Sequence, residues 1–541
     1  MSKPDTLETR QPVRRLDALV IGMGFGGMYA LHRTRGMGLD VLGIEAGDDV
    51  GGTWYWNRYP GARCDVMSID YSYSFSDEIQ QEWTWSEQFS AQPEILSYAR
   101  FVADKLDLKR DIRFETRATR VAYDDDACLW RVETDRGDRF EATYLLMATG
   151  PLSVPKPIDI PGADMFKGEL HLSGKYPHRP VDLSGKRVAV IGTGSSGIQI
   201  VPVVAEQADH LYVFQRTPSF TLPMRNRPLD AAYVAHIKQH YPGLRAAARY
   251  SLTGGSRPMS SRPLFSIPPA EREELLEEAW AYGGLRFLGL FSDLLTNAEA
   301  NEVVAEFVRG KIAEVVEDPD TARRLTPQGY PIFARRPCLD SGYYEAFNRD
   351  NVTLMDCLED PITAFTETGI RTATREVAVD VVIAATGYDA LTGAMLSIDI
   401  TGKNGRSLKE KWADGGRSYL GLAMEGFPNL FIIAGANGPS ALANFILLNE
   451  QNVDWICDCI DHLRTNGLRA IEADGAAEDR WMRKVTELGA RSLYPTANTW
   501  YTGANVPGKP RTFPVYIGGL GRYREICTDA ATDGYAGFHI V

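Results

Sequence analysis

The sequence lacks the features that would place this chain in a membrane or outside the cell. No stretch approaches the roughly 18 uninterrupted apolar residues of a membrane-spanning helix, and the polar N-terminus has no apolar secretion core. Only 7 of the 541 residues are cysteine, an odd number without a repeated spacing. Because disulfide scaffolds carry dense, paired cysteines, we expect free thiols, no membrane association and a cytoplasmic location.

Positive charge and metal-ligand patterns are also scarce. The chain has 58 Lys and Arg against 71 Asp and Glu, which gives a net charge of −13. Nucleic-acid binding needs a basic face, so we expect no nucleic-acid partner. Cys457 and Cys459 lie in an apolar helical pattern without the Cys and His spacing of a metal site. We interpret them as core residues and expect no metal.

What the sequence does contain begins with a strand, a glycine turn and an acidic residue. Residues 16–21 form an apolar run that leads into Gly22, Gly24 and Gly27, and residues 28–34 have helical character. Gly22 suits a tight turn, Gly24 allows backbone to approach a phosphate, and Gly27 lets helix and strand pack closely. A second strand ends in Glu45, near the roughly 20-residue separation at which a carboxylate accepts hydrogen bonds from ribose. The order of these elements predicts an FAD site.

A second unit of the same kind begins at residue 187. The strand 187–191 precedes a glycine turn and a helix over 198–207, and the turn contains Gly192, Gly194, Ser195, Ser196 and Gly197. The next strand, 211–214, is followed by Arg216 and Thr217. An arginine at the ribose position offers a two-pronged donor to a 2′-phosphate, so this unit predicts NADP rather than NAD.

Between the two units, residues 51–65 read GGTWYWNRYPGARCD. This loop resembles the pattern GxWxxxx(Y/F)P(G/M)xxxD of the Baeyer–Villiger monooxygenases, which are flavoproteins. Every fixed position is met, by Gly52, Trp54, Tyr59, Pro60, Gly61 and Asp65. The resemblance extends over essentially the whole chain and looks closest to the phenylacetone and steroid monooxygenase branch.

The resemblance implies roles for particular residues. Arg336 matches the family's active-site arginine, and Asp65 would hold it in place while it stabilises negative charge on oxygen. Arg335 would contact the NADP phosphate, and Trp500 would touch bound NADP. The residues expected to line FAD are Thr53, Trp54, Asp65 and Tyr71. A loop at the start of a long helix would line the substrate pocket with Ser440, Ala441, Leu442 and Phe445.

One family motif is altered here. The expected signature FxGxxxHxxxW(P/D) is met at Phe166 and Gly168, but Leu172 occupies the histidine position and Tyr176 replaces tryptophan. In the family this segment joins domains and serves coordinated movement, so the change bears on coupling between NADPH oxidation and oxygenation. It keeps open an uncoupled NADPH oxidase or a nucleotide-binding protein, and an NADPH-dependent N- or S-oxygenase is a further alternative.

Ala-Thr-Gly at residues 148–150 and again at 385–387 marks the expected crossings between nucleotide domains. The predicted fold is α/β, with two Rossmann-like dinucleotide-binding domains for FAD and NADP. FAD-binding segments are expected at 1–150 and 388–541, NADP-binding segments at 151–220 and 330–387, and a helical insertion at 221–329. The predicted reaction converts a ketone to an ester or lactone with NADPH and O₂, with sulfoxidation as a side activity, and a monomer is compatible with these features.

Overall fold

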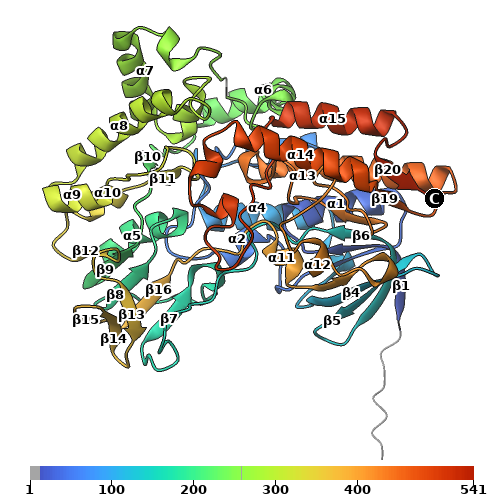
Figure 1. The fold of residues 1–541 in the computed structure, drawn as a ribbon, viewed down its shortest axis with the longest axis horizontal. Helices are drawn as coiled ribbons and strands as arrows, with labels where there is room; N and C mark the ends of the chain where they lie inside the picture. Colours follow the sequence, from blue (N-terminus) through green and yellow to red (C-terminus); the bar gives the residue numbers. More distant parts are fainter. Residues whose placement is uncertain (1–12, 258) are drawn as a thin grey trace, which may run out of the picture.

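The computed structural model describes residues 13–257 and 259–541. It contains two large sheets, which lie at the lower right and lower left of Figure 1. The first has eight strands in the order β17-β4-β5-β6-β1-β2-β3, with β18 pairing with β6. Its central strands β1, β2, β6 and β18 run parallel, whereas β4 and β5 form an antiparallel hairpin at one side. The strands are β1 (Arg14–Ile21), β2 (Val41–Ile44), β3 (Ile112–Arg113), β4 (Ala118–Asp124), β5 (Leu129–Thr134), β6 (Arg139–Met147), β17 (Asp399–Thr401) and β18 (Leu430–Ile432).

The second sheet is parallel throughout, with the order β12-β9-β8-β16-β7. Its strands are β7 (Glu169–Leu172), β8 (Arg187–Ile191), β9 (His210–Gln215), β12 (Val352–Asp356) and β16 (Val381–Ala384). Parallel sheets of this kind bind ligands at the carboxyl ends of their strands. The glycine turn after β8 therefore lies where a dinucleotide is expected.

Each sheet carries a helix directly after its first glycine turn. Helix α1 (Phe25–Gly36) follows β1, and α5 (Ser195–Gln207) follows β8, so both predicted strand–turn–helix units are confirmed. On one face of the first sheet, α1 packs with α4 (Gln92–Lys105) and α13 (Phe445–Thr465) in a large apolar core. Cys457 and Cys459 lie in this core with free thiols, as predicted.

The α-helices of residues 231–325 are α6 (Ala231–Tyr250), α7 (Pro269–Tyr282), α8 (Ala298–Val315) and α9 (Pro319–Leu325). α6 and α7 lie near the top of Figure 1, and α8 and α9 continue down its left side. α7 and α8 share one apolar cluster. α6 packs instead against α15 (Leu520–Thr532) and against residues 69–80. Its buried Arg245 donates to Gln80 Oε1 at 3.0 Å and to Ser72 Oγ at 2.7 Å. α8 and α9 contribute Ile312 and Leu325 to the apolar core of the second sheet, so the segment contacts both halves of the molecule.

The chain crosses between the two sheets twice, and the two crossings run side by side. Lys156 N donates to Gly387 O at 2.9 Å, Asp389 N to Val154 O at 2.9 Å, and Leu391 N to Pro151 O at 2.8 Å. We call residues 151–156 and 387–391 together the crossing ribbon. Because its two segments are hydrogen-bonded, they form one connection.

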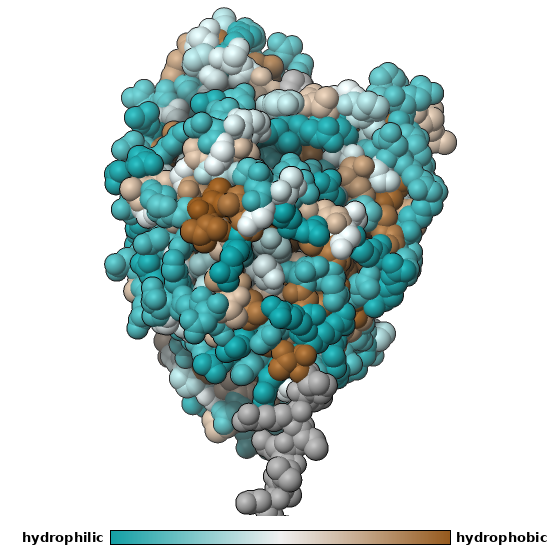
Figure 2. All heavy atoms as spheres, turned by 90° about the vertical axis from the view of Figure 1, so that its right-hand side faces the viewer, coloured by the Kyte–Doolittle hydropathy of each residue, from teal (hydrophilic) through white to brown (hydrophobic). Residues whose placement is uncertain are grey.

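The remaining elements are short or peripheral. They are α2 (Thr53–Trp56), α3 (Asp77–Glu82), β10 (Thr221–Pro223), β11 (Cys338–Asp340), α10 (Tyr343–Ala346), β13 (Ile362–Phe365), β14 (Gly369–Thr372), β15 (Glu376–Ala378), α11 (Gly393–Leu396), α12 (Leu408–Lys411), β19 (Ile471–Ala473), α14 (Gly475–Ala490) and β20 (Phe538–Ile540). The face drawn in Figure 2 is mostly hydrophilic, with small, separate hydrophobic patches. Among the described residues, no helix combines the length and the apolar character that crossing a bilayer requires.

Candidate active site

The two glycine turns, residues 22–27 and 192–197, have the same close packing of strand against helix, and we call each turn a glycine cradle. A Cβ added at Gly27 would lie 1.8 Å from the carbonyl oxygen of Gly22, and one added at Gly197 would lie 1.9 Å from that of Gly192. No side chain fits at either position, so strand and helix can close on each other only through glycine. The amino ends of α1 and α5 are thereby turned toward the space above each turn, where helix N–H groups favour phosphate.

Glu45 ends the second strand of the first unit, as predicted. Its side chain is buried, and it accepts hydrogen bonds from Met23 N at 2.7 Å and from Gly47 N at 2.8 Å. Burial raises the pKa of this carboxyl. Each carboxylate oxygen accepts more than one hydrogen bond, so the two backbone contacts orient Glu45 and leave acceptor capacity for ribose hydroxyls.

At the second unit, basic side chains gather without acidic partners. Arg216 is exposed at the end of β9, and the guanidinium of Arg335 lies 4.2 Å from the ring centre of Tyr330. Arg335 Nε is buried without a hydrogen-bond partner, and no carboxylate of the described residues lies within 4.0 Å of either arginine. Thr193 Oγ1 donates to the carbonyl of Thr217 at 3.0 Å, which fixes the strand end. Uncompensated cations beside a glycine cradle fit a phosphorylated dinucleotide.

The aromatic loop 51–65 is fastened to the helix of the second unit. Gly61 has a φ of +79°, and a Cβ there would lie 2.2 Å from the carbonyl oxygen of Gln199 on α5. Tyr59 donates from its hydroxyl to Gln199 Oε1 at 2.9 Å, and Gln199 Nε2 donates to the carbonyl of Arg63 at 2.9 Å. Burial raises the pKa of Tyr59 to about 12, so this hydroxyl stays a donor. Gly61 of the motif is thus required by close packing between the two nucleotide units.

The loop ends at Asp65, which forms a two-pronged ion pair with Arg336. Arg336 Nε lies 2.8 Å from Asp65 Oδ2, Arg336 Nη2 lies 2.6 Å from Asp65 Oδ1, and Arg336 Nη1 donates to the carbonyl of Ala441 at 3.1 Å. The charge of Asp65 raises the pKa of Arg336, which keeps the guanidinium ionised. The two side chains retain 29% (Arg336) and 16% (Asp65) of their accessible surface, so the pair borders open space.

Two of the predicted flavin-side residues contact each other. Trp54 Nε1 donates to the hydroxyl of Tyr71 at 3.0 Å, and Thr53 is exposed at the start of α2. Ser440 is fully buried with a φ of +43°, in a short 3-10 turn where the sequence indicated an open loop. Its Oγ, like Asn437 Nδ2, is buried without a partner. Such atoms are expected where a polar ligand completes the hydrogen bonding.

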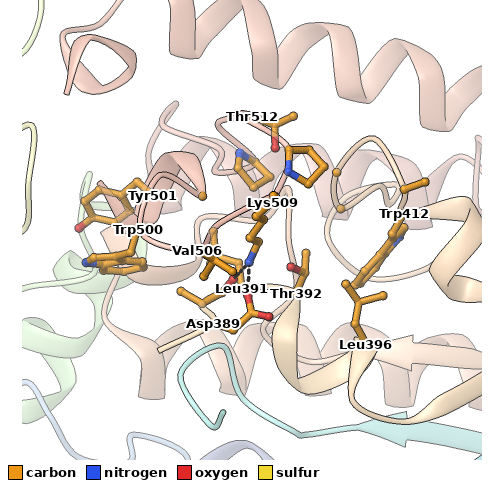
Figure 3. Close-up of a pocket in the computed structure, with 18 of the residues that line it drawn as sticks. Asp389, Leu391, Thr392, Leu396, Trp412, Trp500, Tyr501, Val506, Lys509 and Thr512 are labelled. Carbon is orange, nitrogen blue, oxygen red and sulfur yellow. Dashed lines mark hydrogen bonds and ion pairs between the residues drawn. The ribbon is translucent and has the colours of Figure 1, made fainter. Parts of the chain in front are cut away.

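Trp500 and Tyr501 both line a cavity of about 390 Å³. The rings of Trp500 and Tyr501 are 4.1 Å apart, and Leu442 and Phe445 pack in the same cluster as Tyr501. The cavity is drawn in Figure 3, where Lys509 pairs with Asp389. Neither Arg336 nor Asp65 lines this cavity. Because Trp500 and Tyr501 line the cavity and also pack with Leu442 and Phe445, the cavity adjoins that apolar cluster.

The altered signature lies on β7, the edge strand of the second sheet. His171 contacts Glu169 at 3.2 Å and Tyr176 ring to ring at 5.4 Å, and Tyr176 is buried. Burial lowers the pKa of His171. Two residues further, His178 packs edge-on against Tyr55 of the aromatic loop, with ring centres 4.8 Å apart. The signature thus connects the second sheet to the loop that carries Asp65.

Two connecting residues were missed by sequence reasoning. Gln199 lies half-buried on helix α5, and His178 follows the signature outside its fixed positions. The altered signature, which ends at Pro177, lies directly before His178 in the chain and could have drawn attention to it. No local pattern marks Gln199, because its partners are 136 and 140 positions away.

Comparison with known proteins agrees with this geometry. Residues 19–229 match the family model for pyridine nucleotide-disulphide oxidoreductases. A Baeyer-Villiger monooxygenase of Pseudooceanicola batsensis is 40% identical over 523 residues, 96% of this chain and 95% of the relative. The structure of oxidized steroid monooxygenase bound to NADP is 46% identical with a TM-score of 0.94, covering 97% of this chain and 99% of that one.

A further solved structure, of OTEMO in complex with FAD and NADP, is 39% identical with a TM-score of 0.95 and covers 98% of this chain and 100% of that one. These similarities span the two nucleotide units, the aromatic loop and the C-terminal part. With its two glycine cradles and the Arg336–Asp65 pair between them, the chain belongs to the Baeyer–Villiger monooxygenases.

Proposed function

We propose that the protein oxidises a ketone to an ester or lactone, using FAD, NADPH and O₂. One observation carries this proposal: Arg336 is held in two-pronged contact by Asp65, and the Asp65 loop is itself fastened to the second nucleotide unit. An N- or S-oxygenase with the same cradles would not need this ion pair, so the pair favours chemistry at a carbonyl.

The two cradles assign the cofactors. The first turn (Gly22, Gly24, Gly27) with Glu45, Thr53, Trp54 and Tyr71 would hold FAD, which when bound supplies the oxygen activation. The second turn (Gly192, Gly194, Ser195, Ser196, Gly197) with Arg216, Thr217 and Arg335 would hold NADP, and Trp500 would contact it. Steric closure at Gly27 and Gly197, the buried unpartnered atoms and the unpaired arginines support this assignment.

Arg336 has unused donors for an oxygen anion. A guanidinium carries five N–H groups, and the contacts to Asp65 and Ala441 occupy three of them. The two remaining N–H groups and the permanent charge can stabilise negative charge that develops on oxygen at the ketone carbonyl. Fixed donors of this kind contribute about 3 kcal/mol to a transition state.

Asp65 acts on the substrate through Arg336. Its carboxylate accepts from two different nitrogens, which fixes both the position and the plane of the guanidinium. A guanidinium fixed in this way does not have to reorient when negative charge develops on oxygen. It therefore avoids the reorganisation energy that a mobile donor would cost. Asp65 is therefore a positioning residue, and Arg336 is the catalytic one.

The substrate would lie beside the turn that contacts Arg336. The carbonyl of Ala441 accepts from Arg336 Nη1. Ser440 and Leu442 belong to the same short turn as Ala441, and Leu442 and Phe445 pack in the same apolar cluster. Their mostly apolar surface suits the carbon skeleton of a ketone.

The segments proposed for each cofactor follow the two sheets and the crossing ribbon: 1–150 and 388–541 for FAD, 151–220 and 330–387 for NADP, with the helices of 221–329 as an insertion. We also propose a cytoplasmic location, because all seven cysteines have free thiols, as expected in a reducing compartment.

The test is product analysis with purified, FAD-loaded protein. A panel of cyclic and aryl ketones, with matched sulfides and amines, would be incubated with NADPH and analysed by mass spectrometry. We expect ketones to gain one oxygen atom, derived from ¹⁸O₂, and sulfoxides to form more slowly. NADPH consumption with amine or sulfide products alone, and no ester from any ketone, would contradict the proposal.

A further inference from the structure

Lys156 lies at the carboxyl edge of the second sheet, beside the glycine turn. Its backbone N–H donates to the carbonyl of Gly387, just beyond the end of β16, at 2.9 Å. β16 is hydrogen-bonded to β8, whose glycine turn begins at Gly192, and β8 is paired on its other side with β9, which leads to Arg216. Lys156 and Arg216 therefore flank the turn from opposite sides.

The ammonium group of Lys156 is half-buried and has one recorded partner. Lys156 Nζ donates to the backbone carbonyl of Asn505 at 2.6 Å. No carboxylate among the described residues lies within 4.0 Å of it, although the ion pairs of other lysines are numerous. Burial lowers the pKa of Lys156, and the positive charge of Arg216 lowers it further. The two cations are therefore close enough to repel each other. Two of the three N–H groups of Lys156 remain for an anion.

A dinucleotide lies across such a sheet in a fixed direction, and this direction shows which of its phosphates would face Lys156. The strand after the first βα unit, here β9, ends at the adenosine ribose, and the pyrophosphate lies on the glycine turn. The rest of the nucleotide then extends toward the opposite neighbour, β16. Arg216 and Arg335 are on the 2′-phosphate side, whereas Lys156 is on the side of the second, nicotinamide-bearing phosphate.

We propose that Lys156 binds the pyrophosphate of NADP at the phosphate farther from adenosine, and that through its contact with Asn505 it positions the segment after Trp500 against the bound nucleotide. No local sequence pattern indicates this role, because Lys156 lies in the proline-rich first crossing segment. The proposal rests on NADP binding at the second glycine turn. It makes Lys156 a nucleotide-binding residue outside both glycine motifs.

The test measures equilibrium binding rather than turnover. Isothermal titration calorimetry of the FAD-loaded protein would compare NADP⁺ with 2′,5′-ADP, which has the 2′-phosphate and the adenosine-side phosphate but lacks the second phosphate. Lys156→Gln keeps an N–H donor for the Asn505 carbonyl and removes the charge. We expect it to raise the Kd of NADP⁺ about tenfold, as loss of a hydrogen bond to a charged group does, and to leave that of 2′,5′-ADP unchanged.

Three controls separate binding from folding and from loop anchoring. Lys156→Arg should restore most of the NADP⁺ affinity because it restores the charge. Lys167→Gln, which replaces an exposed lysine paired with Glu367 at 2.5 Å, should leave the Kd of both ligands unchanged. The difference between Lys156→Gln and unmodified protein should shrink at high salt, because screening weakens charge contacts. FAD content and melting temperature check that each variant is folded.

The outcomes are distinct. If the Lys156→Gln variant binds NADP⁺ with the Kd of the unmodified protein, Lys156 does not bind the second phosphate. The same conclusion follows if the substitution raises the Kd values of NADP⁺ and 2′,5′-ADP equally. Arg216→Ala tests the underlying nucleotide assignment separately, since it should weaken both ligands. An unmodified protein that binds neither ligand would overturn the NADP assignment together with this proposal.

Discussion

Replacing Arg336 with alanine is the sharpest test of the proposed chemistry. The substitution removes the fixed charge and the two N–H groups that no protein atom uses. Loss of one such donor typically lowers a turnover rate by about 10²–10³-fold, and we expect ester formation to fall by at least that factor. Reduction of FAD by NADPH should persist, because hydride transfer requires alignment of two cofactors and no oxyanion stabilisation.

The same substitution also leaves Asp65 without its partner, which sets the expected cost to stability. Removing one member of a fully buried pair costs about 3–5 kcal/mol, and an exposed pair contributes about 0–1 kcal/mol. With 29% and 16% of the side-chain surface accessible, this pair lies between the two limits, at about 2 kcal/mol. The double variant Arg336→Ala, Asp65→Ala should recover part of that loss, because it leaves no unpaired carboxylate.

Stopped-flow absorbance separates the two half-reactions, and mass spectrometry measures the ester. Arg336→Lys serves as the matched control: it keeps a charge but cannot make the two-pronged contact, so we expect an intermediate rate. Asp65→Asn should also be intermediate, since Arg336 remains but is less firmly held. Ester formation at the unmodified rate by Arg336→Ala would refute the catalytic role of this arginine.

Further predictions address the cofactors and the signature. Arg216→Ala should reduce the preference for NADPH over NADH at least tenfold by removing a charged contact to the 2′-phosphate; an unchanged ratio of kcat/KM values would count against the second-turn assignment. Gly197→Ala should retain FAD yet lose reduction by NADPH, because its Cβ would lie 1.9 Å from Gly192 O, while dithionite should still reduce the flavin. Hydrogen peroxide should account for a measurable share of the NADPH consumed, and the pair Leu172→His, Tyr176→Trp should lower that share; tight coupling in the unmodified protein would argue that the signature is dispensable here. His178→Ala should raise the peroxide share further, by removing the ring that packs on Tyr55.

The features that could be predicted from the sequence are those determined by residues close together in the chain. A glycine needed for close packing, as at Gly27 and Gly197, leaves a fixed spacing, and an apolar parallel strand leaves a continuous run. Both nucleotide units could therefore be located from residues close together in the chain. The pairing of Asp65 with Arg336, 271 positions apart, was reached through family resemblance, because no local pattern links the two.

Other features depend on tertiary packing and could not be predicted from local sequence. Gln199 joins the aromatic loop to α5 through side-chain and backbone contacts that exist only in the folded molecule. The 440–442 segment has loop-like composition but is buried as a 3-10 turn, because Arg336 and the surrounding aromatic cluster enclose it. Likewise, α6 packs against residues 69–80, and no pattern local to the helix indicates this contact.

The crossing ribbon has a consequence for how this protein can be re-engineered. Because residues 151–156 and 387–391 are hydrogen-bonded to each other, the chain leaves the first sheet and returns to it at adjacent points. A module whose entry and exit coincide can be exchanged without stretching its host, since the ends to be joined are already together. Chimeras that transplant the intervening residues from a relative with a different nucleotide preference should therefore fold when both junctions lie within the ribbon.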